Sequence, residues 1–297
     1  MNAESVKARL KNLSIADGDT MQGKLITYAL ERSIYRLSVS MYANQFTLKG
    51  GIFLYALFDK NFSRATMDID LLAQRIPNDI DEMKRIFKEI FSIEYDDALR
   101  YDLNSLKVSS ITEFKEYHGV NVFINTYLDR TRIPVSIDIG FGDVIYPDRM
   151  QIEFPILLDM DAPRIFAYSV YSVIAEKFEA FVSLGLANSR YKDFYDIYIL
   201  ANRFDLSGNK LQRAIQETFA HRRTPINDIV AFNEEFTDDR ARQKQWNGFV
   251  RKKKAIEDVS FETVLSLIKE LLLPVVETIK LESEYTKEWK KDEKMWI

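Results

Sequence analysis

Three aspartates lie in segments whose apolar alternation predicts β-strands. Asp68 and Asp70 stand one residue apart, and Asp138 lies further along the chain. Because successive side chains of a strand point to opposite faces, Asp68 and Asp70 should share one face of their strand. The residues expected on the opposite faces are Met67, Ile69 and Leu71 in the first segment and Val135, Ile137 and Ile139 in the second. Two carboxylates should therefore converge, and Asp138 adds a third if its strand is a neighbour.

Carboxylates gathered in this way have the chemistry of a divalent-cation site. Mg²⁺ prefers oxygen ligands from a few carboxylates together with substrate phosphates. Two ions about 3.5–4 Å apart can hold the attacking and leaving oxygens of a phosphoryl transfer. An isolated Asp-x-Asp pair is more often a strand edge or a turn, but apolar neighbours make an ionised pair costly without a cation. The pattern favours a nucleotidyl-transfer site in which Asp68, Asp70 and Asp138 bind Mg²⁺ or Mn²⁺.

A glycine pair, Gly50 and Gly51, follows the short apolar segment 46–48 and precedes a stretch that predicts a buried helix. Taken alone, such a pair is more often an ordinary turn. A glycine turn at the start of a helix also lets backbone N–H groups approach a phosphate closely, and Lys49 adds positive charge there. With the aspartate pair downstream, the glycines favour a triphosphate site.

A lysine interrupts the apolar stripe of the helix predicted over 172–184. At helical spacing Lys177 falls in line with Val170, Val173, Ile174 and Phe181. Such a lysine either extends past the core to reach water or points at an anion, and this segment leaves both open. The acids beside it, Glu176 and Glu179, are expected to be surface charges.

A dense group of charges opens the next predicted helix, over 192–202. Asn188 or Ser189 is suited to cap this helix, and acids in its first turn favour the helix dipole. The charged residues of the group are Arg190, Lys192, Asp193 and Asp196. They could instead hold Lys177 or a nucleotide in register.

Basic residues with interleaved aromatics occupy the segment 240–254, which contains no acid. The basic residues are Arg240, Arg242, Lys244, Arg251, Lys252, Lys253 and Lys254. Usually such a run is a solvated helix whose aromatics, here Trp246 and Phe249, pack on the core. The alternative is a surface that binds a nucleic-acid backbone and its exposed bases.

The remaining pattern predicts an α/β (α+β) fold, with a mixed β-sheet flanked by helices and then a helical C-terminal domain. We expect a first domain over 1–160, with a helical lead-in that runs to about Tyr42 after an N-cap at Asp17, and a second domain over 161–297. Predicted strands cover 46–48, 106–111, 120–128 and 133–141, with a hairpin loop at 129–132. Predicted helices cover 52–58, 78–91 with an Asn78 cap, 172–184, 192–202, 210–219 and 261–272, the last interrupted by Pro274. The mixed-charge tail 282–294 is expected to be a solvated helix face.

The composition excludes several kinds of chemistry. The chain of 297 residues has no cysteine and two histidines, which excludes disulfides and thiol nucleophiles and disfavours histidine-centred catalysis. Its net charge is −4, so a nucleic-acid contact would need a local basic patch. No apolar stretch is long enough to span a membrane, and the first residues lack the layout of a signal peptide. We expect a soluble cytoplasmic protein.

Several ordered motifs together resemble the AbiEii/AbiGii toxin family of nucleotidyltransferases, within the DNA-polymerase-β-like superfamily. The resemblance runs from about residue 45 to 255. The segments that carry it are Leu48–Gly51, Arg64–Asp70, Ile137–Ile139, Glu176–Ala180, Arg190–Asp196 and Gln245–Phe249. The glycine pair departs from the Gly-Ser of many superfamily members, but leaves phosphate contact by the backbone possible.

The resemblance implies the toxin of a bacterial toxin–antitoxin pair, related to abortive phage infection. Such a toxin transfers a nucleotide from an NTP to an acceptor, which in studied relatives is the tRNA 3′ end, and it has a cognate antitoxin as partner. By this likeness Asp68 and Asp70 bind metal, Lys177 contacts the nucleotide and Asp193 is an essential acid. The candidate catalytic residues are Asp68, Asp70, Asp138, Lys177, Asp193 and Asp196. The candidate nucleotide-binding residues are Lys49, Gly50, Gly51, Arg64, Thr66, Lys177, Arg190 and Lys192.

Two other functions agree with the same residues. The first keeps the reaction but takes a protein side chain or a small molecule, such as an aminoglycoside, as acceptor. The second is a nucleotide-binding regulator without turnover, because a fold and its motifs do not guarantee catalysis.

Overall fold

The computed structural model describes residues 2–59, 66–113, 117–226, 229–252 and 259–297. The chain forms two compact units. The first comprises Met1–Gly142 and Met150–Tyr168, and the second comprises Asp143–Arg149 and Ser169–Ile297. Within the described residues, no helix combines the length and the apolar character that a bilayer crossing requires.

A mixed sheet forms the centre of the first unit. Over the described residues it has seven strands in the order β3-β4-β5-β2-β1-β7-β6. The strands are β1 (Phe46–Lys49), β2 (Ile69–Ala73), β3 (Leu99–Glu113), β4 (Tyr117–Leu128), β5 (Thr131–Phe141), β6 (Met150–Glu153) and β7 (Arg164–Ala167). The pairs β2/β5 and β1/β7 are parallel, and the others are antiparallel. The predicted mixed sheet flanked by helices is confirmed.

The predicted hairpin is also present. Its strands β4 and β5 remain paired as far as Leu128 and Thr131, so the turn is two residues long rather than four. Asp129 takes the positive φ of 55° in this turn, which aspartate tolerates better than most residues. Strand β3 begins at Leu99, earlier than expected, because the ladder with β4 continues beyond an irregularity between Asp102 and Lys107.

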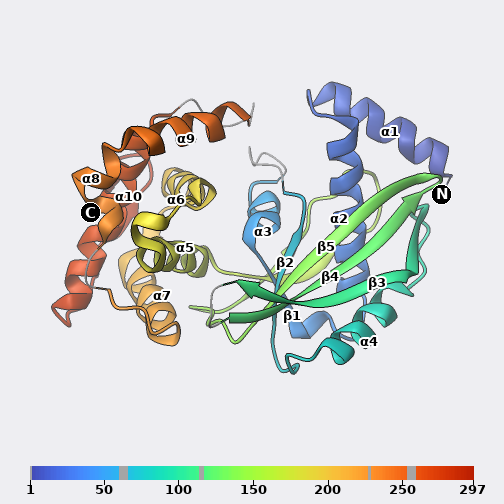
Figure 1. Ribbon diagram of the computed structural model, residues 1–297, viewed down its shortest axis with the longest axis horizontal. Helices are drawn as coiled ribbons and strands as arrows, with labels where there is room; N and C mark the ends of the chain where they lie inside the picture. Colours follow the sequence, from blue (N-terminus) through green and yellow to red (C-terminus); the bar gives the residue numbers. More distant parts are fainter. Residues whose placement is uncertain (1, 60–65, 114–116, 227–228, 253–258) are drawn as a thin grey trace. The chain divides into compact units, whose positions relative to one another are not determined.

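Four α-helices accompany this sheet in the described residues (Figure 1). They are α1 (Ala3–Ala16), α2 (Met21–Ser38), α3 (Gly50–Leu57) and α4 (Ile80–Phe91), with a 3₁₀ turn η1 (Ala43–Gln45). Both predicted caps were wrong. Asp17 ends α1, and Thr20 caps α2 by accepting from the Gly23 amide; the lead-in is two helices rather than one. Asp79, not Asn78, caps α4 by accepting from the Glu82 amide at 2.7 Å.

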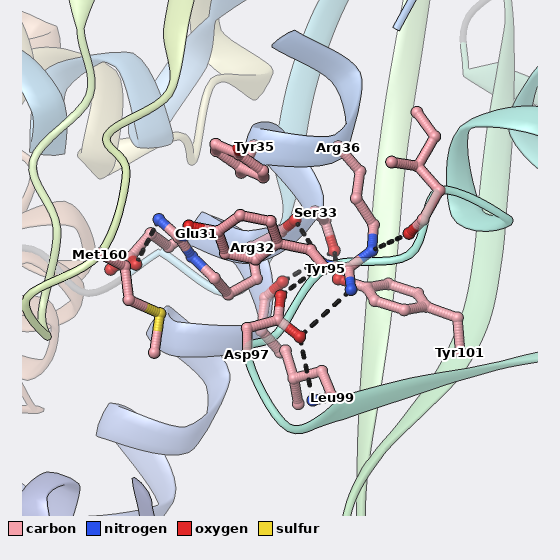
Figure 2. A network of polar contacts seen from close by, with 12 residues as sticks. Glu31, Arg32, Ser33, Tyr35, Arg36, Tyr95, Asp97, Leu99, Tyr101 and Met160 are labelled. Atoms are coloured by element: carbon pink, nitrogen blue, oxygen red, sulfur yellow. Dashed lines mark hydrogen bonds and ion pairs between the residues drawn. The ribbon is translucent and has the colours of Figure 1, made fainter. Parts of the chain in front are cut away.

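A buried polar network fastens α2 to the chain before β3 (Figure 2). The Arg36 guanidinium donates to both Asp97 carboxylate oxygens, at 2.6 and 3.1 Å, and to the Ile93 carbonyl. Asp97 also accepts from the Leu99 amide at 3.0 Å. Both charged groups are buried, and removing them from water costs free energy. The two parallel hydrogen bonds between guanidinium and carboxylate offset that cost, so we assign this pair a structural role.

The second unit is mainly helical. Its helices are α5 (Val170–Leu184), α6 (Tyr191–Arg203), α7 (Gly208–His221), α8 (Glu234–Thr237), α9 (Arg240–Lys252) and α10 (Phe261–Lys280). Short 3₁₀ turns, η2 (Gly185–Ala187) and η3 (Val230–Phe232), join some of them, and a small antiparallel sheet contains β8 (Leu206–Ser207), β9 (Glu288–Lys290) and β10 (Met295–Trp296).

Two expectations for this unit were wrong. Pro274 does not interrupt α10, which continues to Lys280 because the apolar face around the proline, including Leu272 and Val276, is buried and offsets the missing backbone bond. The tail 282–294 is not a solvated helix. It contributes β9, whose Trp289 is fully buried and donates to the Ala201 carbonyl at 2.8 Å.

Candidate functional site

A row of polar residues crosses four adjacent strands of the first unit. Lys49 on β1 is paired with Asp70 on β2, Asp70 with Asp138 on β5, and Asp138 with Asn121 on β4. Paired residues of neighbouring strands project from the same face of a sheet. These four side chains, which we call the polar row, therefore lie along one line and are all half-buried.

The alternation of each strand produces the row. Ile69 and Leu71 on β2, and Ile137 and Ile139 on β5, are buried on the opposite face. The condition set for Asp138 is met, because its strand β5 is a direct neighbour of β2 and the register pairs Asp138 with Asp70. Met67 does not share the apolar face as predicted: it lies before β2 begins and is 65% exposed. Asp68 likewise precedes the strand and lies outside the row.

Asp138 and Asp68 each accept a side-chain hydrogen bond from a nearby residue. Asp138 Oδ1 accepts from Asn121 Nδ2 at 2.6 Å. Asp68 Oδ1 accepts from the Thr66 hydroxyl at 3.1 Å. Each bond fixes the orientation of the carboxylate that accepts it.

Gly50 begins α3 directly after β1 and lies against the third aspartate. Its φ is +64°, and a Cβ placed on it would overlap the Asp70 carboxylate and come within 2.7 Å of Asp70 Cβ. Rotation of the Asp70 side chain cannot relieve the second contact, so only glycine fits here. Lys49, the N-cap of α3, supplies no side-chain hydrogen bond to the helix. The start of α3 thus places backbone N–H groups beside the polar row, as a phosphate site requires.

The donors present fit a hard divalent cation in type. Asp70 and Asp138 are neighbours in the row, and Asp68 lies two residues before Asp70. These carboxylates supply the oxygen ligands that Mg²⁺ and Mn²⁺ prefer. In the described part of the chain, however, no three acidic, histidine or cysteine side chains are gathered into a ready-made ligand shell.

A second group of candidate residues forms a buried ion cluster in the second unit. Lys177 Nζ on α5 lies 2.7 Å from Asp193 Oδ1 and 2.7 Å from Asp196 Oδ2, both on α6. Arg190 Nε lies 2.7 Å from the other oxygen of Asp193. The Lys177 side chain is 12% exposed, that of Asp193 1% and that of Asp196 0%. The question left open for Lys177 is resolved: it points at anions, namely these two carboxylates.

The electrostatics of this cluster favour the ionised form of Asp193. Burial alone would raise the pKa of Asp193, but Lys177 and Arg190 outweigh burial and lower that pKa below its usual value. Lys192 is exposed, and Arg190 is half-exposed. Asn188 is buried and accepts from the Arg190 amide at 2.8 Å, which orders the chain just before α6.

Glu176 and Glu179 are not the surface charges that the sequence suggested. Glu179 is buried and accepts from Arg222 at 2.7 Å and from Thr224 at 2.6 Å. Arg222 also pairs with Asp143 and Glu176. Burial would lower the pKa of Arg222, but the surrounding carboxylates outweigh it and raise that pKa. The sequence around Glu176 and Glu179 does not indicate that they pair with an arginine more than 40 residues later in the chain.

The basic segment forms α9, whose aromatics pack inward. Trp246 is fully buried, donates to the Val259 carbonyl at 2.8 Å and lies against Phe261. Arg242 also turns inward: it donates to the Asn188 and Leu186 carbonyls and lies 3.8 Å above the Phe236 ring. By contrast, the exposed basic residues are Arg240, Lys244 and Arg251, which share one helical face.

Some candidate residues cannot be placed. Arg64, Lys253 and Lys254 lie outside the described residues, and for Lys252 only the backbone is described. Sequence reasoning also missed Asn121. Its signal was available, because Asn121 alternates with the apolar Val120 and Val122 as Asp138 does with its own neighbours, but an amide in a strand does not by itself indicate chemistry.

Comparison with known proteins gives one family and a set of related structures. The model of the family described as nucleotidyl transferase AbiEii toxin, type IV toxin–antitoxin system, matches residues 32–267. The chain is similar to JHP933 from Helicobacter pylori, with 11% identity and a TM-score of 0.49, over 89% of this chain and 95% of that one. It is also similar to a protein provisionally described as a nucleotidyltransferase from H. pylori, with 12% identity and a TM-score of 0.49, over 86% and 96% of the two chains. No curated protein sequence matches.

Proposed function

We infer that this chain, which belongs to the AbiEii family of nucleotidyl transferase toxins from type IV toxin–antitoxin systems, transfers a nucleotidyl group from an NTP to the 3′ end of a tRNA. The observation that carries this proposal is the polar row, in which two carboxylates on neighbouring strands lie beside a glycine-started helix. In the reaction, the acceptor hydroxyl forms a bond to the α-phosphorus, the bond from that phosphorus to the β-phosphate breaks, pyrophosphate leaves and the hydroxyl proton passes to solvent.

The three aspartates are proposed to hold the divalent cation. Mg²⁺ or Mn²⁺ bound by Asp68, Asp70 and Asp138 would neutralise charge that develops on the phosphates. Thr66 and Asn121 keep two of these carboxylates oriented through the bonds described above. Since a nucleotidyl transfer requires little covalent chemistry from the protein, positioning and charge neutralisation supply most of the rate enhancement.

The residues at the start of α3 are proposed to bind the triphosphate. The amides of Gly50 and Gly51 carry the partial positive charge of a helix N-terminus, and Lys49 stands at the same point of the row. Thr66 and Arg64 complete the candidate set in the first unit. Gly50 is the residue for which the geometry is most demanding, because its lack of a side chain is what lets the helix start approach Asp70.

Lys177 is proposed to contact the nucleotide, with Asp193 and Asp196 holding its ammonium in place. The two aspartates fix the lysine from one side at 2.7 Å each. Holding a long flexible side chain in one rotamer reduces the entropy lost when it meets a phosphate. Arg190, half-exposed beside Asp193, and the exposed Lys192 are candidates for the same nucleotide.

The acceptor is proposed to be RNA because of the outer face of α9. Arg240, Lys244 and Arg251 present positive charge there, although the whole chain carries a net charge of −4. A local basic stripe of this kind suits a phosphate backbone. A cognate antitoxin is the partner that the family implies.

The test is nucleotide transfer by the purified protein. Wild type is incubated with each α-³²P-labelled NTP, Mg²⁺ and total tRNA, beside Asp68→Ala. The matched control is Asp102→Asn, which alters a strand aspartate of the same sheet that lies outside the row. Label on tRNA from wild type and the control, but not from Asp68→Ala, supports the proposal. Label on protein or on a small molecule instead would reassign the acceptor, and NTP binding without any product would indicate a regulator.

A further inference from the structure

Asn121 makes two hydrogen bonds with its amide nitrogen. Nδ2 donates to Asp138 Oδ1 at 2.6 Å and to the Ser136 hydroxyl at 2.8 Å. An amide has two N–H donors, so both are used. The reverse orientation would place the amide oxygen against the Asp138 carboxylate and is excluded by repulsion. The side chain is therefore fixed by its partners.

The position is an unusual one for asparagine. The neighbours of Asn121 along β4, Val120 and Val122, are buried on the other face of the sheet. Asparagine is depleted in strands, and a β-branched or aromatic residue would suit a half-buried strand position better. Folding alone therefore gives no reason for an amide here, whereas the adjacent carboxylate does.

The bond from Asn121 orients the Asp138 carboxylate. Asp138 lies directly beside Asp70 in the register, and Asn121 pairs with Asp138 from the strand on its other side. Donation to Oδ1 at 2.6 Å fixes the rotation of the carboxylate about its Cβ–Cγ bond. The direction of the second oxygen, Oδ2, is set at the same time, because both oxygens belong to one planar group.

We propose that Asn121 is a positioning residue: its amide fixes the orientation of the Asp138 carboxylate and thereby sets the affinity of the carboxylates for a divalent cation. The inference rests on the proposed function, in which these aspartates bind the cation. Donors that orient metal ligands change metal affinity or activity by about 10- to 100-fold when they are removed. Asn121 touches neither substrate nor metal, and acts through Asp138.

The test is Mn²⁺ binding by the purified full chain without NTP or RNA, followed by the loss of the free-ion signal in electron paramagnetic resonance. Asn121→Leu keeps the approximate shape of the side chain but removes the donor. We expect its Mn²⁺ dissociation constant to rise about 10- to 100-fold. The matched control is Asn125→Leu, on the same strand and the same face but opposite Pro134, and it should bind as wild type does.

A double-mutant cycle separates this role from a general effect on the sheet. If Asn121 acts only through Asp138, Asn121→Leu should weaken Mn²⁺ binding in the wild-type background and change nothing further in an Asp138→Asn background. Asn121→Ala, which has no side-chain donor, serves as a second variant if the leucine variant fails to fold. Thermal unfolding should be within error of wild type for each variant used.

The outcomes distinguish this inference from the proposed function. One outcome is that Asp138→Asn and Asp70→Asn weaken Mn²⁺ binding while Asn121→Leu and Asn121→Ala bind normally. This would overturn the role of Asn121 and leave the metal site intact. Unchanged binding by the two aspartate variants would overturn both. Equal losses from Asn121→Leu in the wild-type and Asp138→Asn backgrounds would show a route that does not involve Asp138, and would also overturn the inference.

Discussion

The two groups of charged candidate residues differ in how deeply they are buried. In the first unit, Asp70 and Asp138 are half-buried and stand side by side with like charge. In the second, Asp193 and Asp196 are almost fully buried, and a lysine lies within 2.7 Å of each. The half-buried carboxylates of the first unit are accessible to a cation. The carboxylates of the second group are already ion-paired with Lys177 and, for Asp193, with Arg190.

The difference predicts opposite responses to the removal of charge. Asp70→Asn should lower nucleotidyl transfer by about a thousandfold or more, since a metal ligand contributes several kcal/mol to the transition state. Its thermal stability should be close to that of wild type, because the substitution keeps the size of a half-buried side chain. Transfer is measured with labelled NTP, and unfolding by calorimetry. Loss of folding in Asp70→Asn would show that this carboxylate is structural instead.

Removing a charge from the ion-paired cluster of the second unit should lower the stability of that unit. Lys177→Met removes the ammonium that lies 2.7 Å from each of two buried carboxylates and should destabilise the second unit by about 3–5 kcal/mol. The chain offers a direct probe, because its three tryptophans, Trp246, Trp289 and Trp296, all lie in the second unit. Tryptophan fluorescence during urea unfolding therefore follows this unit alone. Lys192→Met, at an exposed lysine of α6, is the control and should unfold as wild type does.

Backbone geometry gives a third contrast. Gly50→Ala should destabilise the first unit by about 1–3 kcal/mol through strain and should also lower nucleotidyl transfer, because the new Cβ displaces Asp70. Gly18 has the same kind of φ, +65°, but open space around it. Gly18→Ala should therefore show the strain without any loss of transfer. Equal activity of the two variants would indicate that the approach of Gly50 to Asp70 has no functional role.

Low pH should remove the contribution that Asp193 makes to folding stability. Its pKa is lowered in the folded state, so the stability it adds is present above the pKa of the unfolded chain, about 3.9, and is lost as the pH falls through the folded value. The difference in unfolding free energy between wild type and Asp193→Asn should be constant near neutrality and shrink below about pH 4. Tryptophan fluorescence across pH 3–8 measures it, and a difference that persists at the lowest pH would contradict the assignment.

The smallest effect is expected on the outer face of α9. Neutralising Arg240, Lys244 and Arg251 together to glutamine should weaken tRNA binding and reduce its salt dependence by about one counterion per residue in direct phosphate contact. Arg242→Gln, which removes inward hydrogen bonds, should lower stability instead. Filter binding at several salt concentrations separates the two. An unchanged salt slope for the triple variant would remove α9 from the acceptor site.

The sequence predicted those features that depend on periodicity within one segment. The alternation around Asp70 and Asp138, the glycine turn before α3 and the helices that carry Lys177 and Asp193 all follow local rules. Local rules failed where tertiary packing decides. The charged tail forms a strand of a small sheet because Trp289 is buried there. Helix α10 continues past Pro274 because its apolar face is buried.

Partners distant in sequence were also beyond prediction. Arg222 converts Glu179 from an expected surface charge into a buried one, and nothing near either residue indicates the other. Asn121 is recognisable only when the register that pairs it with Asp138 is known. The candidate residues were therefore identified by chemical type and spacing, whereas the residues that orient them required the fold.

The contact between Gly50 and Asp70 has a consequence for the genetics of this chain. Every substitution of Gly50 introduces a Cβ, and every Cβ meets the backbone-proximal part of Asp70. In a screen for loss of activity, changes at Gly50 should appear with those at Asp70 whatever residue replaces the glycine. A position that carries no functional group would then be as intolerant of change as a carboxylate, because what it contributes to the site is empty space.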